Sequence, residues 1–369
     1  MDAKPLEVAV VGSTFGSYYM RAVKFLEPDF HLAGLVARGS KESVECARAF
    51  GIPLYKNVAE LPKSIDVVCV TVRTTVTGGS GTAIVMDCLN RGFSVLVEAP
   101  MHFRDLSECF QLAKEKGVAF KMGDMYSNLS VPKTMIETAA EIRKDHKRPV
   151  YINFKTSVQV YLNGIRFLLK CLPDTEAIEV KETIDQGPFT VIAAKLLPEN
   201  IHITIELNDE MMPGIPDAYF HLLHALEVYY PGGRLTMTDT YGAAIWHNRM
   251  HLGPEFMKEG YKNLTGTGTV ADAHSYRVLS ECKEAGEVYN LRRMYQWPRA
   301  IAEELSILKQ MMDGDRTLFL TENKQDIHAA TIWSKLTTDA GYPKIRTDIP
   351  CEYYEPGMAL GEDYEDEEI

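Results

Sequence analysis

Short apolar runs alternate with amphipathic stretches along the first third of the chain. Runs rich in β-branched residues predict buried strands at 8–11, 32–37, 66–72, 94–98 and 118–122. Apolar residues spaced three to four apart predict helices at 18–26, 41–50, 81–91 and 105–116. Strands that alternate with such helices form a parallel sheet, because each helix returns the chain across one face. The pattern predicts an α/β domain built on a doubly wound parallel sheet.

The pattern changes beyond a connecting helix expected at 131–142 and a polar segment at 143–149. Without a helix between each pair, longer strands are expected at 151–160, 189–196, 201–207 and 235–241. Further helices are expected at 218–228, 298–311 and 324–339. These elements predict a second, α+β domain with a mostly antiparallel open sheet. We expect the first domain at 1–125, the second at 126–360 and an acidic, solvated tail at 361–369.

Composition excludes several classes of protein. The 369 residues are 46% hydrophobic and 24% charged, which is ordinary for a folded protein of two domains. The formal net charge of −12 opposes binding to DNA or RNA, because such ligands require a basic surface. We find neither a signal peptide nor an apolar run of membrane-spanning length, so we expect a cytoplasmic protein without a membrane partner. The seven cysteines are scattered and lack metal-binding spacing, so we expect reduced thiols and no metal.

The first strand-to-helix turn carries the sequence Gly12-Ser13-Thr14-Phe15-Gly16. At such a turn, backbone N–H groups and the helix dipole form a site for a pyrophosphate. Gly12 occupies the tight turn, but Thr14 stands at the second glycine position of the Gly-x-Gly-x-x-Gly pattern, and Gly16 lies one residue before the third. The loop predicts a dinucleotide site, and the alternative is an ordinary turn between a strand and a helix.

The end of the second strand, Arg38-Gly39-Ser40, favours one form of dinucleotide. A fold selective for NAD usually ends this strand with a carboxylate that binds the ribose 2′-hydroxyl, whereas an arginine and a hydroxyl fit a 2′-phosphate. NADPH is therefore the expected cofactor. Arg38 could instead be an ordinary surface residue, and Ser40 could be the N-cap of the next helix, a role compatible with phosphate binding.

A loop rich in hydroxyl groups and glycine follows the third clear strand, and it contains Thr71, Val72, Arg73, Gly78 and Gly79. It lies at the carboxyl edge of the predicted sheet, where ligands of such folds bind, so we expect it to contact the cofactor. The alternative is that its glycines serve only a tight turn.

Together with Glu98-Ala99-Pro100-Met101-His102, these motifs resemble the thiazolinyl imine reductases of siderophore biosynthesis. That family is a branch of the glucose-fructose oxidoreductase and inositol dehydrogenase superfamily (Gfo/Idh/MocA), which joins a Rossmann domain to an α+β domain. The resemblance covers the first 170 residues well and the rest loosely. It implies NADPH-dependent reduction of a thiazoline C=N bond to a thiazolidine, and it adds Glu98 and Ala99 to the expected cofactor contacts.

The resemblance also implies partners. The thiazoline substrate would be tethered to a carrier domain of a nonribosomal peptide synthetase, and the protein would form a homodimer through the open sheet of its second domain. Reduction of the imine needs an acid that protonates the ring nitrogen as hydride arrives.

Two residues are candidates for that acid. Tyr126 follows the last strand of the first domain and matches the tyrosine proposed as the donor in the family; a buried aromatic at the domain boundary is the alternative. His102 could donate or relay a proton, or it could cap the helix that follows.

The chain departs from the superfamily at two positions. Ala99 stands where the superfamily places a catalytic lysine and the imine reductases a histidine, and the segment Leu162-Asn-Gly-Ile-Arg166 lacks the Asp and His of an Asp-x-Gly-x-His motif. Enzymes that oxidise sugars need such a base, so both losses oppose a sugar or polyol dehydrogenase, the first alternative function. A non-catalytic dinucleotide-sensing regulatory protein is the second.

Two pairs of histidines stand close together in the sequence. His221 and His224 share a face of the helix expected at 218–228, and His247 and His251 lie in a loop. Neither pair has the carboxylates or cysteines that would complete a metal site, so packing is the expected role. The loop of His247 could also line the substrate pocket.

Overall fold

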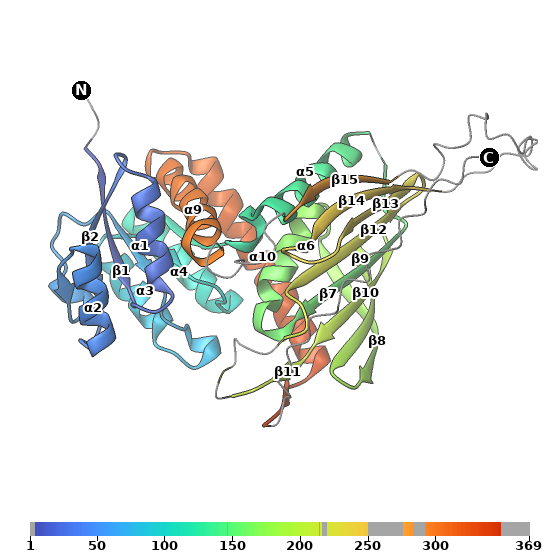
Figure 1. Cartoon of the computed structure of the whole chain (residues 1–369), viewed down its shortest axis with the longest axis horizontal. Helices are drawn as coiled ribbons and strands as arrows, with labels where there is room; N and C mark the ends of the chain where they lie inside the picture. Colours follow the sequence, from blue (N-terminus) through green and yellow to red (C-terminus); the bar gives the residue numbers. More distant parts are fainter. Residues whose placement is uncertain are drawn as a thin grey trace, which may run out of the picture.

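The computed structural model describes residues 4–145, 147–213, 215, 220–249, 276–282 and 292–347. Two sheets lie at opposite ends of the long axis, one formed early in the chain and one formed later, with helices between them (Figure 1). The histidine at 251 and the acidic tail at 361–369 fall outside the described residues.

The first sheet has six parallel strands in the order β3-β2-β1-β4-β5-β6. Its strands are β1 (Leu6–Val11), β2 (Phe30–Val36), β3 (Leu54–Tyr55), β4 (Val67–Val70), β5 (Ser94–Val97) and β6 (Phe120–Met122). Its helices are α1 (Gly16–Phe25), α2 (Lys41–Phe50), α3 (Gly81–Asn90) and α4 (Phe103–Lys116). All residues of β4 and β5 are buried, as expected of parallel strands covered on both faces. The predicted parallel sheet is confirmed, and the unpredicted β3 is too short to show a period.

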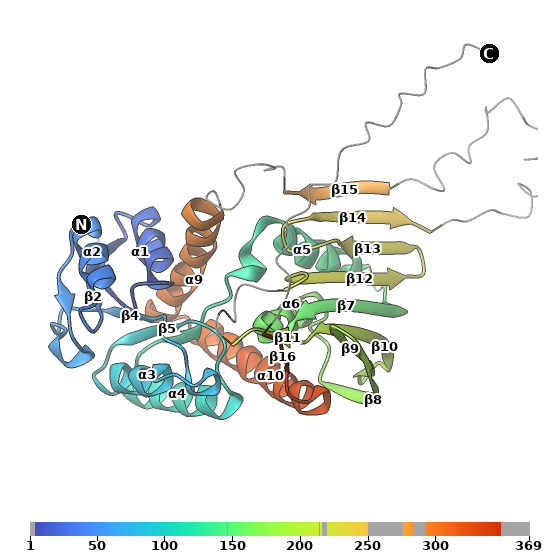
Figure 2. The same ribbon diagram turned by 60° about the horizontal axis from the view of Figure 1, so that its bottom comes forward.

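The second sheet has eight strands in the order β15-β14-β13-β12-β7-β10-β9-β8. Its strands are β7 (Tyr151–Ser157), β8 (Ala177–Gln186), β9 (Phe189–Leu197), β10 (Ile201–Asn208), β12 (His224–Tyr230), β13 (Gly233–Met237), β14 (Ala243–Asn248) and β15 (Tyr276–Glu281). β7 and β10 are parallel, and the other neighbours are antiparallel. Helices α5 (Ser130–Lys144), α6 (Tyr161–Cys171) and α10 (Arg316–Ala340) cover one face (Figure 2). This confirms the predicted mostly antiparallel sheet.

The helix predicted at 218–228 is wrong. The described part of this segment leads into the strand β12, which pairs with β7 and β13 and alternates buried and partly exposed side chains. Alternation at a period of two matches a strand with one covered face, and pairing on both sides outweighs the helical spacing of its apolar residues. His221 and His224 therefore do not share a helix face: His224 begins β12, and His221 precedes it.

The last two helices join the domains. Helix α9 (Trp297–Met312) packs against α1, and its apolar side chains share a core with β1 and β4. Helix α10 contacts α4 and β6 of the first domain as well as α6 and β8 of the second. Both helices confirm predicted ones, although α10 begins earlier than expected. Because each contacts elements of the first domain, the chain returns to that domain after completing the second sheet.

Candidate active site

The loop between β1 and α1, residues 12–16, has the tight turn typical of a phosphate-binding loop, and we call it the phosphate cradle. Gly12 has a φ of +102°, and a Cβ at this position would lie 2.7 Å from Oγ1 of Thr71. A Cβ on Gly16 would lie 3.1 Å from the same oxygen. Thr71 in turn donates from Oγ1 to the carbonyl of Val11 at 2.8 Å. The structure therefore brings Thr71 against the predicted loop, and both glycines are required by that close approach.

The N-terminus of α1 is open to an anion. Phe15 is its N-cap residue, no side chain caps the helix, and no acidic residue occupies the first turn. The first N–H groups of the helix and the positive end of its dipole therefore have no side-chain competitor. These features fit the pyrophosphate of a dinucleotide, which such a helix start binds through its backbone.

Arg38, Gly39 and Ser40 lie beside this loop at the end of β2, since Gly12 donates its N–H to the carbonyl of Val36 at 3.0 Å. All three are exposed. Ser40 is the N-cap of α2 and accepts from the N–H of Ser43 at 3.3 Å, so the capping alternative is confirmed. Its contact with a cofactor, and that of Arg38, stay predictions.

Close backbone contacts shape the glycine-rich loop after β4. A Cβ on Gly79 would lie 1.9 Å from the carbonyl oxygen of Arg73, so no larger residue fits there unless the backbone moves. Thr74 donates to the carbonyl of Pro100 at 2.5 Å and ties this loop to the segment after β5. The turn itself accounts for the glycines, and contact of this loop with a cofactor stays a prediction.

Glu98 directly follows β5 and binds a residue that the sequence did not point to. Its Oε2 accepts from the hydroxyl of Tyr19 on α1 at 2.5 Å. Burial raises the pKa of Glu98 to about 7, although the hydrogen bond from Tyr19 and the charge of Arg166 act in the opposite direction. In the sequence, Tyr19 fits the apolar spacing of α1. The pattern therefore does not predict its contact with a carboxyl group 79 positions away. The following residue, Ala99, packs against the core.

Tyr126 lies where the first domain meets the second. It begins the short helix η3 (Tyr126–Asn128), and its ring contacts that of His224 edge-to-face, with the centroids 5.3 Å apart. Nδ1 of His224 lies 2.9 Å from Oγ1 of Thr156, and burial lowers the pKa of His224 to about 3. The imidazole is therefore neutral at physiological pH. The contact of His224 was not expected, because the sequence predicted a helix at 218–228. Its position at the start of β12 brings His224 to this junction.

His102 caps a helix, which was the alternative to a catalytic role. It is the N-cap of α4, and its Nδ1 accepts from the N–H of Arg104 at 3.3 Å. Its ring also lies against Phe103, with centroids 4.4 Å apart. A catalytic role for His102 stays a prediction.

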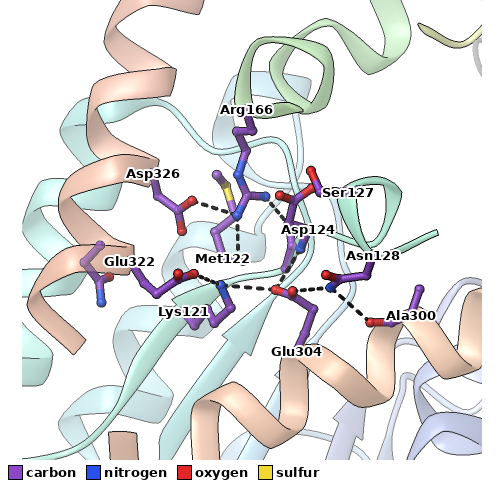
Figure 3. Close-up of polar contacts among 12 residues, drawn as sticks. Lys121, Met122, Asp124, Ser127, Asn128, Arg166, Ala300, Glu304, Glu322 and Asp326 are labelled. Atoms are coloured by element: carbon purple, nitrogen blue, oxygen red, sulfur yellow. Dashed lines mark hydrogen bonds and ion pairs between the residues drawn. The ribbon is translucent and has the colours of Figure 1, made fainter. Parts of the chain in front are cut away.

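A buried ionic network lies beneath this site (Figure 3). Nζ of Lys121, on β6, lies 2.5 Å from Oε2 of Glu322 and 3.2 Å from Oε2 of Glu304. Burial opposes the charge on Lys121, but carboxylates led by Glu304 outweigh that effect and raise its pKa. The two glutamates belong to α10 and α9, so this lysine fixes both helices to the first sheet.

Arg166 belongs to the same network. It reaches from α6 to the carbonyls of Met122 and Gly123 and pairs with Oδ1 of Asp326 at 2.7 Å (Figure 3). Its side chain is 3% exposed, so these partners occupy a guanidinium that is almost out of contact with water. Arg166 therefore joins the end of β6 to the second domain.

The segment that carries Tyr126 is held from both sides. Asp124 donates its N–H to Oε2 of Glu304 at 3.0 Å, and its Oδ2 lies 2.7 Å from Nζ of Lys170. Burial alone would raise the pKa of Asp124, but the charges of Arg166 and Lys170 lower it below its usual range. On the other side of Tyr126, Nδ2 of Asn128 donates to Glu304 and to the carbonyl of Ala300 on α9. Each end of the loop is thus bonded to a helix of the later chain, and the position of Tyr126 is fixed accordingly.

In the described part of the chain, no three histidine, cysteine, aspartate or glutamate side chains are placed to share a metal ion. None of the helices described combines the length and apolarity needed to cross a membrane.

Two families match the chain, one for each domain. Residues 6–124 match the oxidoreductase family GFO_IDH_MocA, with an NAD-binding Rossmann fold. Residues 147–247 match the C-terminal domain of the Irp3-like thiazolinyl imine reductases. No curated protein matches the chain.

Solved structures of oxidoreductases share the fold. An oxidoreductase from Agrobacterium radiobacter, in complex with NAD+, L-tartaric acid and magnesium, is 11% identical with a TM-score of 0.64, over 91% of this chain and 96% of its own. A 3-ketoreductase from Actinomadura kijaniata with NADP is 14% identical with a TM-score of 0.63, over 91% and 97%. Biliverdin reductase from Synechocystis, with biliverdin and NADP+, is 12% identical with a TM-score of 0.62, over 92% and 100%.

The fold and the phosphate cradle define an oxidoreductase with an NAD(P)-binding Rossmann domain. The first domain is of the Gfo/Idh/MocA oxidoreductase family, and the second domain is of the thiazolinyl imine reductase type.

Proposed function

We propose that this protein catalyses the NADPH-dependent reduction of a thiazoline C=N bond to a thiazolidine, on a carrier-bound intermediate of nonribosomal siderophore synthesis. The observation that carries the proposal is the match of residues 147–247 to the thiazolinyl imine reductases. In this family the second domain would contact the substrate, and here it meets Tyr126 through His224.

Tyr126 is the proposed proton donor. The cofactor, when bound, would supply a hydride to the carbon of the C=N bond. The ring nitrogen then needs one proton, and a phenol is protonated at neutral pH and able to donate. The network around Asp124 supports this role because it fixes the loop that carries the phenol.

The competing dehydrogenase has less support in the geometry. Ala99 carries no group that could accept a proton, and Arg166 is bonded to two carbonyls and a carboxylate rather than placed as a base. Oxidation of an alcohol needs a base near the reacting carbon, whereas reduction of an imine needs an acid. Tyr126 satisfies the second requirement.

NADPH is the proposed form of the cofactor, since Arg38 and Ser40 stand exposed beside the phosphate cradle. The other residues proposed to contact the cofactor are Thr71, Val72, Arg73, Gly78, Gly79, Glu98 and Ala99.

We also propose a cytoplasmic homodimer. β9 alternates buried and partly exposed residues, so one face of the second sheet is left for a partner copy. The six described cysteines form no disulfide, which accords with a reducing compartment. Sedimentation of the purified protein at several concentrations tests the dimer, and a monomer at every concentration would contradict it.

The deciding experiment offers the purified protein two classes of substrate. One reaction contains NADPH and a hydroxyphenyl-thiazolinyl-thiazoline thioester, and the others contain NADP+ with a panel of sugars and polyols. Oxidation of NADPH together with a thioester product heavier by two hydrogens supports the imine reductase. Turnover of a polyol contradicts it, and tight binding of NADPH without turnover of either class favours the regulatory alternative.

A further inference from the structure

An arginine of the later chain is linked to the phosphate cradle through aromatic side chains, and one of its nitrogens lacks a partner among the described residues. Arg292 begins η7 (Arg292–Gln296), a π-helical turn that leads into α9. Its Nε is buried and donates to no acceptor among the described residues. A buried guanidinium N–H without an acceptor is costly unless an anion completes it. π-Helical turns also occur frequently at functional sites.

Stacking fixes the guanidinium of Arg292. Its central carbon lies 3.7 Å from the centroid of the Tyr241 ring, which belongs to the turn between β13 and β14. The indole Nε1 of Trp297 donates to the hydroxyl of Tyr241 and holds that ring in place. Such a cation–π contact orients a guanidinium while leaving its edge free to bind an anion.

The same aromatic group reaches the phosphate cradle. The ring of Trp297 lies 6.0 Å from that of Phe15, within the cradle, and 5.0 Å from that of Tyr18 on α1. One aromatic layer thus connects Arg292 with the open N-terminus of α1.

Among the described residues, the carboxyl group of Asp239 interacts with the charge of Arg292. Asp239 lies near enough for the charge of Arg292 to lower its pKa, although burial raises that pKa overall. Its oxygens accept from the backbone N–H groups of Leu223 and Tyr241, at 3.4 Å and 3.2 Å. Among the described residues, Asp239 and Arg292 are not joined by a hydrogen bond or an ion pair, so the edge of the guanidinium is left to another anion.

We infer that Arg292 binds the diphosphate of the dinucleotide, on the phosphate of its nicotinamide half. The adenosine half is assigned to the end of β2, where Arg38 stands, whereas Tyr241 and Arg292 approach from the second domain. The backbone of the cradle supplies N–H groups but no charge, and Arg292 supplies the charge. This inference depends on the NAD(P) site and not on the thiazoline substrate.

The test measures binding by calorimetry without any thiazoline, so its failure is separate from that of the proposed reaction. The ligands are NADPH and adenosine 2′,5′-bisphosphate, which lacks the nicotinamide half and its phosphate. Arg292→Met should weaken NADPH roughly 10- to 100-fold, since one charge-assisted contact is lost, and should change the affinity for the bisphosphate less than about twofold. Arg292→Lys should give an intermediate loss, because it keeps the charge without the fork of donors.

Arg299→Met is the matched control, because Arg299 is an exposed arginine of α9 whose guanidinium lies over Phe25. It should bind both ligands like the wild type. Unchanged NADPH affinity in both Arg292 variants, with normal melting curves, overturns the inference. An equal loss for NADPH and the bisphosphate also overturns it, because the effect would then not belong to the nicotinamide half.

Discussion

Two carboxyl groups, the partly buried Glu98 and the fully buried Asp124, follow neighbouring strands, and their pKa values move in opposite directions. Burial raises the pKa of Glu98, after β5, to about 7, and its hydrogen-bond donor is the neutral phenol of Tyr19. Asp124, after β6, is also buried, but Arg166 and Lys170 lower its pKa. At this edge, burial favours a neutral carboxyl group and nearby cations reverse the preference. At this sheet edge, the charges around Asp124 therefore compensate one another, and we call this part the compensated half. The other half, around Glu98, can hold a proton.

Removing a cation from the compensated half should have the largest effect. Arg166→Met leaves Asp326 and the carbonyls of Met122 and Gly123 buried without their donor. We expect the free energy of unfolding to fall by about 3–5 kcal/mol, the range found when one partner of a buried pair is lost. Urea denaturation at neutral pH measures it.

Arg91→Met is the control for that loss of charge. Arg91 pairs with Asp87 on the surface of α3 at 2.9 Å, so its removal should change stability by less than about 0.5 kcal/mol. A similarly small effect for Arg166→Met would mean that the two halves of the edge do not differ in the way described.

Glu98→Gln tests the half that holds a proton. The pKa of Glu98 in the folded protein, about 7, lies above its ordinary value of 4.5, so between these pH values the folded state binds a proton that the unfolded state has released. The stability due to this group is present at low pH and is lost as the pH rises through 7. Relative to the wild type, the cofactor-free variant should therefore gain up to about 3 kcal/mol between about pH 5 and pH 8.

Urea denaturation at the two pH values measures this gain. Glu115→Gln, which changes an exposed glutamate of α4, should run parallel to the wild type. If the stability of Glu98→Gln also runs parallel, Glu98 titrates like an exposed glutamate, and the contrast with Asp124 disappears.

Tyr126→Phe tests whether the loop that Asp124 holds in place positions the proton donor. Loss of the hydroxyl should lower kcat roughly 100-fold with little change in the affinity for NADPH, because a general acid acts in the transition state and not in cofactor binding. Stopped assays with the thiazoline thioester and calorimetry separate the two quantities. His102→Asn keeps a helix-capping side chain and should leave kcat nearly unchanged. An unaltered rate for Tyr126→Phe would mean that His102 or water, and not Tyr126, donates the proton.

The fold was predictable wherever packing follows from local pattern. In the first domain each strand is a continuous apolar run between helices, and β4 and β5 are buried along their whole length. The segment at 218–228 shows the opposite case: its apolar spacing suits a helix, and only the pairing of β12 with β7 and β13 makes it a strand. Such pairing joins residues far apart in the chain and leaves no local signal.

The site divides in the same way. The turn at Gly12 and the capping serine Ser40 are local features and were recognised as such. The contacts of three residues were not predicted, because each has its partner on a distant element. Tyr19 contacts Glu98, Lys121 contacts Glu304 and His224 contacts Tyr126. Their sequence neighbours are ordinary strand and helix residues, so no motif marks them.

Arg38→Ala gives the smallest effect and extends the comparison to an exposed charge at the same sheet edge. Arg38 has no ion pair among the described residues, so its removal should cost little stability. It should weaken NADPH about 10-fold or more and leave NADH unchanged, because only NADPH carries the 2′-phosphate. Arg48→Ala removes an exposed arginine of α2 and should alter neither affinity. Equal losses for the two cofactors in Arg38→Ala would show that Arg38 acts on the whole dinucleotide, and the preference for NADPH would need another source.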